Sequence, residues 1–403
     1  MIERNPAPHK AGPVLFALAV GGFAIGTTEF ATMSLLPDFA RGLDIDAPTA
    51  GHVISAYALG VVVGAPVIAV LAARLARRTL LILLMALFAL GNGLSALAPD
   101  YGWMMAFRFL SGLPHGAYFG TAALVAASLV PVNRRTQAVG RIFLGLTCAT
   151  VVGVPAANAL GRAVGWRWSF GVVAMLGLLT MALVAWLAPR TAADPQSSPL
   201  RELGALKRMQ VWLTLGTGAI GFGGLFAVYT YLADILTRVT LVSANTVPVV
   251  LAIFGMGMTL GNIAVPWAAD RRIMTTAAGL LLWSALVLAL FPFVAGNLWL
   301  VSIDVFLIGI GGALGTVLQT RLMDVAEDAQ GLAASLNHSA FNTANALGPF
   351  LGGLAIAGGY GWTSPGWVGC LLALGGLALC LLSAFLGRRQ LQLAQQQVQT
   401  AAR

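Results

Sequence analysis

Three ionisable residues lie deep inside long apolar segments of the sequence: Glu29, Arg108 and Asp304. A charge at that depth in a bilayer costs at least about 2 kcal/mol, so such residues face protein or water and are functional by default. A desolvated carboxyl binds a proton more readily than one in water, and a nearby arginine opposes that tendency. The chemistry that these residues could perform together is therefore proton uptake and release: the carboxyls of Glu29 and Asp304 would bind and release the proton, and Arg108 would modulate that binding. The alternative for Arg108 and Asp304 is a structural ion pair that links two helices, since buried charges survive by pairing.

A second group of polar and aromatic residues could line a cavity. His115 follows Pro114, and a histidine there could relay protons or form a packing hydrogen bond. A polar helix face at three- and four-residue spacing, suited equally to substrate hydrogen bonding or to helix association, is formed by Asn337, His338, Asn342 and Asn345. The aromatic candidates for a cavity wall, which could equally be packing residues, are Tyr57, Tyr118, Phe222, Phe226 and Tyr229.

Composition identifies the environment of these residues. The chain has 403 residues, of which 58% are hydrophobic and 9% charged, whereas soluble domains carry about 25% charged residues. The net charge of +9 does not indicate nucleic-acid binding, because the basic residues fall in short loops between apolar runs. Cys148, Cys370 and Cys380 lie in apolar segments without metal-type spacing. We expect no metal, no cofactor and no enzymatic activity, and the sequence has no phosphate-binding loop for ATP.

Runs of about 20 apolar residues, enough to cross a bilayer as a helix, recur twelve times. They lie near residues 13–37, 50–73, 79–98, 103–130, 139–160, 168–187, 211–236, 247–269, 274–295, 298–320, 332–357 and 365–386. The polar stretch 189–208 between the sixth and seventh runs is expected to be a linker with a short amphipathic piece.

The distribution of basic residues predicts the orientation. An even number of spans places both termini on one side, which carries seventeen basic residues, whereas the other side carries only Arg41, Arg162, Arg167 and Arg238. The positive-inside rule then predicts that both termini are cytoplasmic.

The two halves repeat each other. At an offset of 197 residues, Gly60, Gly64, Arg74 and Gly112 align with Gly257, Gly261, Arg271 and Gly309. With a slip of two or three residues, "ATVVGVP" at Ala149 matches "ANALGP" at Ala344. Six spans repeated once imply two related bundles with a substrate site at their interface.

Three stretches carry a family resemblance: "GTTEFATMSLLPDFARGLDI", "TAGHVISAYALGVVVGAPVIAVLAAR" and "RFLSGLPHGAYFG". The sequence resembles the major facilitator superfamily, and within it the drug:proton antiporters of the arabinose-efflux type, over nearly the whole chain. The resemblance implies that helices one, four, seven and ten line a central cavity. It also implies an acid at the position of Glu29, which favours a functional carboxyl there.

The chain departs from the family pattern in a loop that the resemblance associates with gating. After the second span the loop reads "VLAARLARR", with Ala73 where the family has an aspartate, although Arg74 is present. The equivalent loop after the eighth span keeps Asp270 and Arg271. The gating candidates are therefore Arg74, Asp270 and Arg271, and we expect Asp270 and Arg271 to contact the first bundle when the protein faces outward.

These observations predict an all-α membrane protein with twelve transmembrane helices in two pseudo-symmetric six-helix bundles, the major facilitator fold. The predicted divisions are residues 1–188, a linker at 189–208, residues 209–387 and a cytoplasmic tail at 388–403. The predicted function is proton-coupled efflux of a small organic compound, drug or sugar-like, by a monomer in the inner membrane. The alternatives are an uncoupled sugar or metabolite facilitator and a polytopic membrane protein without transport, such as an enzyme or sensor.

Overall fold

The described part of the chain consists of helices joined by turns and loops. The computed structural model describes residues 11–192, 197–243 and 245–401, and no strand occurs in these ranges. Arg4, Lys10, Arg403 and residues 193–196 of the predicted linker lie outside the described residues. Because the interior of a bilayer offers no water to bond backbone groups, continuous helices satisfy these groups within each span.

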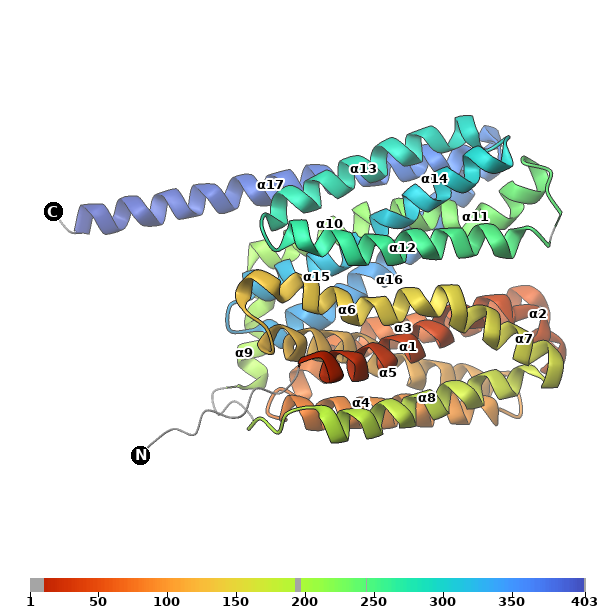
Figure 1. The fold of residues 1–403 in the computed structure, drawn as a ribbon, viewed down its shortest axis with the longest axis horizontal. Helices are drawn as coiled ribbons and strands as arrows, with labels where there is room; N and C mark the ends of the chain where they lie inside the picture. Colours follow the sequence, from red (N-terminus) through yellow and green to blue (C-terminus); the bar gives the residue numbers. More distant parts are fainter. Residues whose placement is uncertain (1–10, 193–196, 244, 402–403) are drawn as a thin grey trace.

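The first half of the chain forms one bundle. Its elements are α1 (Ala11–Ser34), α2 (Leu36–Gly42), α3 (Ala47–Leu71), α4 (Arg77–Ala96), α5 (Tyr101–Ser128), the 3-10 turn η1 (Val132–Arg134), α6 (Arg135–Cys148), the π-helical η2 (Ala149–Gly153), α7 (Val154–Val164) and α8 (Trp166–Leu187). In Figure 1 these elements occupy the lower half of the molecule.

A short linker and a second bundle follow. The linker contains α9 (Pro199–Leu203) and η3 (Gly204–Lys207), where the sequence predicts a short amphipathic piece between the two halves. The second bundle comprises α10 (Met209–Gly221), α11 (Gly223–Arg238), α12 (Val247–Ala269), α13 (Ile273–Val294), α14 (Leu298–Ile310), η4 (Gly311–Ala313), α15 (Leu314–Val325), α16 (Gln330–Ala355), η5 (Ile356–Tyr360) and α17 (Ser364–Ala401). The predicted tail is largely a continuation of α17, which projects beyond the bundle (Figure 1). The exact division of the chain into domains stays a prediction.

Ten spans in the described chain are long and apolar enough to cross a membrane. The other two long helices, α5 and α16, complete the twelve predicted spans. Their mean hydropathy is lower than that of the ten other spans because they contain polar residues, among them Arg108, His115, Asn337, His338 and Asn342. They also pack against each other between the bundles. The two spans with these polar side chains therefore meet each other at the interface between the bundles.

The internal repeat is reproduced in three-dimensional contacts. A Cβ added at Gly60 would collide with the carbonyl of Phe109, and one at Gly257 with the carbonyl of Phe306, 197 residues later in both cases. In the same way, Gly64 faces Leu113 and Gly261 faces Ile310. These glycines let α3 approach α5, and α12 approach α14, more closely than any side chain would allow. The contacts confirm the predicted pseudo-symmetry.

Close packing also explains the small residues of α1. A Cβ on Gly22 would lie 2.8 Å from the carbonyl oxygen of Ile142, and one on Gly26 would lie 3.1 Å from that of Leu146. Both contacts are made with α6, which confirms that this face of α1 points into protein. Glu29, one turn further along α1, is thereby directed away from lipid.

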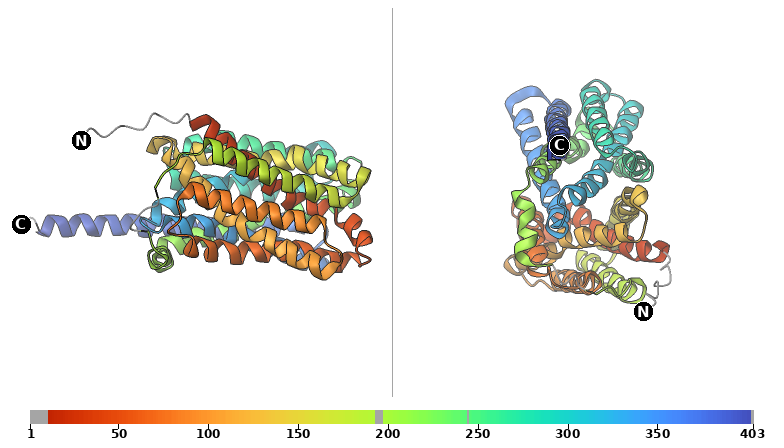
Figure 2. Two further views of the ribbon diagram at one scale, coloured as in Figure 1. Left: turned by 90° about the horizontal axis from the view of Figure 1, so that it is seen from below. Right: turned by 90° about the vertical axis from the view of Figure 1, so that its left-hand side faces the viewer.

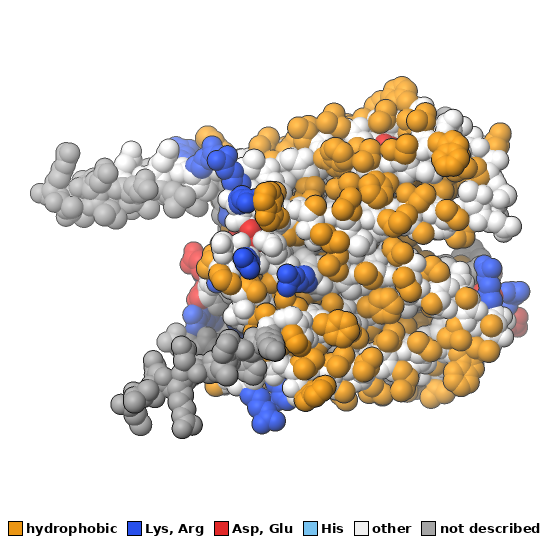
Figure 3. Space-filling view, viewed as in Figure 1, with side chains coloured by type: hydrophobic (Ala, Val, Ile, Leu, Met, Phe, Trp, Pro, Cys, Tyr) orange, Lys and Arg blue, Asp and Glu red, His pale blue; other side chains and the backbone are white. Residues whose placement is uncertain are grey.

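Hydrophobic and basic side chains are distributed differently along the long axis of the molecule. Figure 2 shows the helices running nearly parallel along this axis, with the start of α1 and the end of α17 at one end, which we call the terminus side. In Figure 3 hydrophobic side chains cover the middle of the visible face, and lysine and arginine gather mainly towards its ends. This distribution suits a protein that spans a bilayer.

Candidate functional site

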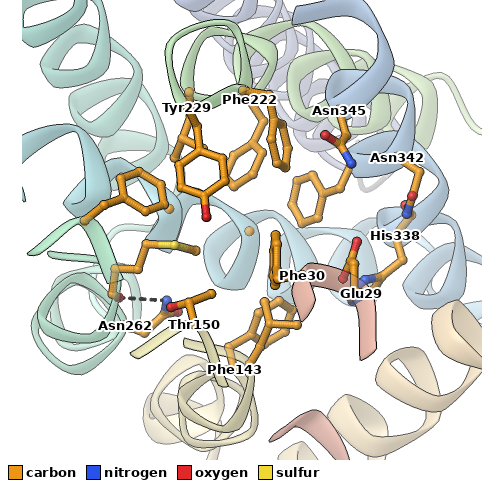
Figure 4. A pocket seen from close by; sticks show the side chains of 18 of the residues that line it. Glu29, Phe30, Phe143, Thr150, Phe222, Tyr229, Asn262, His338, Asn342 and Asn345 are labelled. Atoms are coloured by element: carbon orange, nitrogen blue, oxygen red, sulfur yellow. Dashed lines mark hydrogen bonds between the residues drawn. The ribbon is translucent and has the colours of Figure 1, made fainter. Parts of the chain in front are cut away.

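A small cavity of about 60 Å³ lies between the two bundles. The first bundle contributes Glu29, Phe30, His115, Phe143, Leu146 and Thr150. The second contributes Phe222, Leu225, Phe226, Tyr229, Phe254, Met258, Asn262, Gly312, Gly315, His338, Phe341, Asn342 and Asn345 (Figure 4). Drug-sized ligands need about 300 Å³ or more, so the bundles or their side chains must move before such a molecule fits.

Breaks in helix geometry coincide with the cavity. Thr150 lies in the π-helical segment η2, Phe222 lies between α10 and α11, and Gly312 lies in η4. Local π and 3-10 segments within a longer helix are frequent at functional sites and hinges. The backbone is therefore irregular where the two bundles face the shared cavity.

Glu29 and Arg108 form the charged end of the site. Arg108 is 1% exposed, and its Nη1 donates a hydrogen bond of 3.0 Å to Thr28 Oγ1. Its guanidinium lies 4.4 Å from the ring centroid of Tyr57, a cation–π contact. Glu29 lines the cavity and interacts electrostatically with both Arg108 and Tyr57. The Glu29 carboxyl therefore lies within the field of a buried cation that has no acid within salt-bridge distance among the described residues.

A chain of hydrogen bonds leads from this charged end across the interface. Tyr57 Oη lies 3.0 Å from His115 Nδ1, and His115 Nε2 lies 3.1 Å from His338 Nδ1. His338 comes from the second bundle, and its ring stacks on Phe119 of the first with centroids 4.4 Å apart. A hydrogen bond between two imidazoles needs one donor and one acceptor, so the rings must hold matching tautomers. The free end of the chain is His338 Nε2, which is buried and has no hydrogen-bond partner in the described structure.

Asp304 occupies a different environment from the one that an ion pair would need. It is 2% exposed, and neither carboxylate oxygen has a hydrogen-bond partner within the described ranges. The alternative interpretation of Arg108 and Asp304 as an ion pair is therefore wrong for this conformation. Asp304 also does not line the cavity. A buried carboxyl without any partner is the least costly when it carries a proton.

Several predicted cavity residues lie elsewhere. Tyr118 donates to the carbonyl oxygen of Leu18 at 2.8 Å and packs inside the first bundle. Asn337 donates to Gln319 Oε1 at 2.7 Å, within the second bundle. Tyr57 lies behind His115 rather than on the cavity surface. The structure places these three polar groups away from the cavity because each satisfies a hydrogen bond within its own bundle.

The remaining predicted cavity residues do line it. Phe222 stacks on Phe341 with centroids 4.6 Å apart and packs edge-on against Phe226 at 5.5 Å. The other predicted residues on the cavity surface are His115, Tyr229, His338, Asn342 and Asn345.

Sequence reasoning missed several contributors, among them Phe143, Thr150, Asn262 and Phe341. Asn262 was the most detectable, since it is an isolated amide in the apolar run 247–269. It accepts a hydrogen bond from Thr316. The three others have no feature in the sequence that separates them from packing residues.

On the terminus side, one of the three gating candidates joins the bundles. Asp270 accepts hydrogen bonds from the backbone N–H groups of Thr136 at 2.7 Å and Gln137 at 3.2 Å, at the start of α6. Gln137 Nε2 donates a third bond at 2.9 Å. Arg271 instead stacks on Trp267 of its own bundle, 3.4 Å from the ring centroid. Arg74 is exposed, and no partner is seen for its side chain among the described residues.

The sequence model of the family described as Major Facilitator Superfamily matches this chain over residues 18–271 and 211–399. The chain belongs to the major facilitator superfamily. This family membership confirms the resemblance seen in the sequence, and the family's members are transporters rather than enzymes.

The sequence is similar to those of known bacterial proteins over most of its length. The inner membrane transport protein YdhP of Escherichia coli (strain K12) is 43% identical over 91% of this chain and 94% of its own length. A chloramphenicol resistance protein of Streptomyces lividans is 34% identical over 92% of this chain and 95% of its own. Among solved structures, the proton:xylose symporter XylE matches with a TM-score of 0.74 over 92% of this chain and 94% of that one. At 14% identity the XylE likeness shows the fold alone. The protein is therefore a multi-pass membrane transporter.

Proposed function

We propose that this transporter exports a small organic compound across the inner membrane in exchange for protons. The observation that carries the proposal is the position of Glu29: a carboxyl on the wall of the cavity between the bundles, with the buried Arg108 in electrostatic range. A carboxyl at this place can meet substrate and solvent alternately as the bundles move. Coupling requires two states of different proton affinity, because a ligand shifts an equilibrium only by its differential affinity.

The cavity wall supports a mostly apolar substrate with a few hydrogen-bonding groups. Aromatic side chains dominate the lining, and the amides of Asn262, Asn342 and Asn345 add polar contacts (Figure 4). Aromatic walls bind flat or lipophilic molecules through large contact areas. The name of the chloramphenicol resistance relative, a protein 34% identical to this chain, fits that substrate class.

Two further assignments belong to this proposal. The terminus side is cytoplasmic, because it carries seventeen of the loop arginines and lysines against four on the other side. In the described conformation, hydrogen bonds join the bundles at His115–His338 and, on the cytoplasmic side, at Asp270. We assign it to a state closed towards the cytoplasm. Asp304, buried and unpartnered, is a second proton-binding group.

The test is transport by protein in proteoliposomes with an imposed pH gradient. Chloramphenicol, a lipophilic phosphonium cation and arabinose serve as radiolabelled probes. The unmodified protein should accumulate at least one probe against its gradient when the lumen, into which the probe is pumped, is acidic. Glu29→Gln keeps the size and hydrogen-bonding capacity of the side chain but cannot titrate. It should abolish gradient-driven accumulation while downhill exchange of the same probe remains measurable.

Two variants serve as comparisons. Glu327→Gln removes an acid that pairs with Arg208 of the linker and whose side chain is 77% exposed. This variant should leave accumulation unchanged. Asp304→Asn should reduce accumulation if Asp304 carries a proton. Full gradient-driven accumulation by Glu29→Gln would refute the role of Glu29 and favour uncoupled facilitation.

A further inference from the structure

The two bundles meet on the terminus side at two equivalent helix starts. Helix α6 begins at Arg135, and α16 begins at Gln330, 195 residues later. The same offset aligns Ala149 with Ala344 further along these two helices. Under it, Thr136 and Gln137 correspond to Gly331 and Leu332. The first backbone N–H groups of a helix have no partner within the helix and need an acceptor from elsewhere.

At the start of α6 the second bundle supplies that acceptor. Asp270, which follows α12, receives the N–H groups of Thr136 and Gln137. By the 197-residue repeat, the first-bundle counterpart of Asp270 is position 73, after α3. That position is Ala73, whose side chain accepts no hydrogen bond. The loop after α3 therefore cannot supply a carboxylate to α16.

A carboxylate from the linker occupies the equivalent position. Glu202, in α9, accepts the N–H of Leu332 at 2.7 Å, the counterpart of the Gln137 contact. A Cβ on Gly331 would lie 3.1 Å from both carboxylate oxygens of Glu202, so the missing side chain makes room for the close approach. Glu202 is 8% exposed, which is unusual for a glutamate in a connecting segment.

The linker is fastened to both bundles around this contact. Ser197 Oγ donates to the carbonyl oxygen of Ala73 itself at 2.8 Å. Arg201 and Arg208 pair with Asp328, just before α16, at 3.0 Å and 2.6 Å. Ala205 of the linker packs in one apolar cluster with Ala69 of α3 and Leu332 of α16. The linker thus lies at the place where a loop acid at position 73 would act.

We propose that Glu202 replaces the acid missing at position 73, so that the linker forms the second carboxylate contact that holds the terminus side closed. The two closing contacts are then Asp270 on α6 and Glu202 on α16, one from each side of the pseudo-symmetry. In this arrangement the linker is a moving part of the transport cycle, because α16 can separate from the first bundle only when Glu202 leaves Leu332 or the linker leaves Ala73. The proposal needs alternating access but neither a particular substrate nor proton coupling through Glu29.

The direct test is hydrogen–deuterium exchange of the full-length protein in nanodiscs, read at the peptide that contains Leu332. Glu202→Ala should speed exchange there by roughly fivefold, the scale of losing a capping side chain. Glu202→Gln should retain most of the protection, because its amide oxygen can still accept. The decisive variant is Glu202→Ala with Ala73→Asp, which should restore protection by returning the acid to the repeat position. Asp234→Ala, which removes a half-exposed acid that pairs with Arg238 within α11 and does not contact the linker, is the control and should change nothing.

A second readout follows the closure itself. Spin labels at Val132 and Thr275, one on each bundle, are introduced after replacement of Cys148, Cys370 and Cys380. Glu202→Ala should increase the population with long distances by a similar factor, and the double variant should reverse that increase. Unchanged exchange and distances in Glu202→Ala would overturn the proposal. Failure of Ala73→Asp to restore either quantity would overturn the claim that Glu202 stands in for the repeat acid. Both readouts are independent of transport, so neither depends on the outcome for Glu29.

Discussion

Replacement of Asp270 by alanine should open the terminus side of the transporter. Asp270 holds three hydrogen bonds from the start of α6, of 2.7, 3.2 and 2.9 Å. Two of them come from backbone N–H groups that the helix cannot satisfy, and the third comes from the side chain of Gln137. All three cross from the second bundle to the first, so the open state loses them.

The magnitude follows from two separable contributions. Loss of a capping side chain costs about 0.5–2 kcal/mol. Loss of a negative charge at a helix amino terminus costs a further ~0.3–1 kcal/mol. The side-chain bond from Gln137 is partly replaced by water and adds little. A total of about 1–3 kcal/mol corresponds to roughly a 5- to 150-fold shift of the closed-to-open ratio. Asp270→Asn keeps an acceptor but loses the charge, so its shift should be near the lower limit.

Double electron–electron resonance between labels at Val132 and Thr275 measures this ratio. The long-distance population should rise in the order unmodified, Asn variant, Ala variant. Arg271→Ala is the matched control: Arg271 stacks on Trp267 of its own bundle and should not alter the distances. Equal distance distributions for the unmodified protein and Asp270→Ala would refute the reasoning and leave Asp270 as a solvated loop charge.

Two further predictions concern helix packing and pH. Gly60→Ala adds a Cβ that would collide with the carbonyl of Phe109, so it should destabilise the detergent-solubilised protein by about 1–3 kcal/mol. Gly51→Ala in the same helix is the control: its Cβ meets nothing within 4 Å, so the melting temperature should be unchanged or raised. Burial raises the pKa of Glu202 above its ordinary value of 4.5, and the negative charge of Asp328 raises it further. The hydrogen bond from Leu332 and the positive charges of Arg201 and Arg77 lower this pKa, but by less than burial raises it. The docked linker therefore binds protons more tightly than the released one, so docking should strengthen as pH falls from 7 towards 4.5. Exchange at Leu332, corrected for the intrinsic pH dependence, should slow over that range, and Glu202→Gln should abolish the effect.

Much of the architecture could be predicted from the sequence because the bilayer imposes simple rules. Each of the twelve apolar runs falls in a helical span of the described structure, because a helix satisfies its backbone groups within the span where lipid offers no partner. The offset of 197 predicted the two bundles, and the paired contacts of Gly60 and Gly257 confirm it in space. The depth of Glu29 in an apolar run marked it for attention, because a carboxyl there must face protein.

The partners of the polar residues could not be read from the chain. Arg108 and Asp304 lie at similar depths in equivalent helices, but Arg108 bonds Thr28 and Asp304 bonds nothing in the described structure. Which side chains meet depends on helix rotation and on how the bundles dock, and these are set by many weak contacts spread over the interface.

The clearest difference between what the sequence determines and what the tertiary structure decides lies at the starts of α6 and α16. The sequence alone showed that Asp270 is present and that its counterpart is Ala73. Only the tertiary structure brought Glu202 to Leu332, across 130 residues of chain. A linker has no periodicity from which its docking could be inferred, and its position is decided by the unsatisfied N–H groups at the start of α16 and by the apolar surface around Ala69. The physical reason is that a helix end requires an acceptor, whichever segment of the chain supplies it.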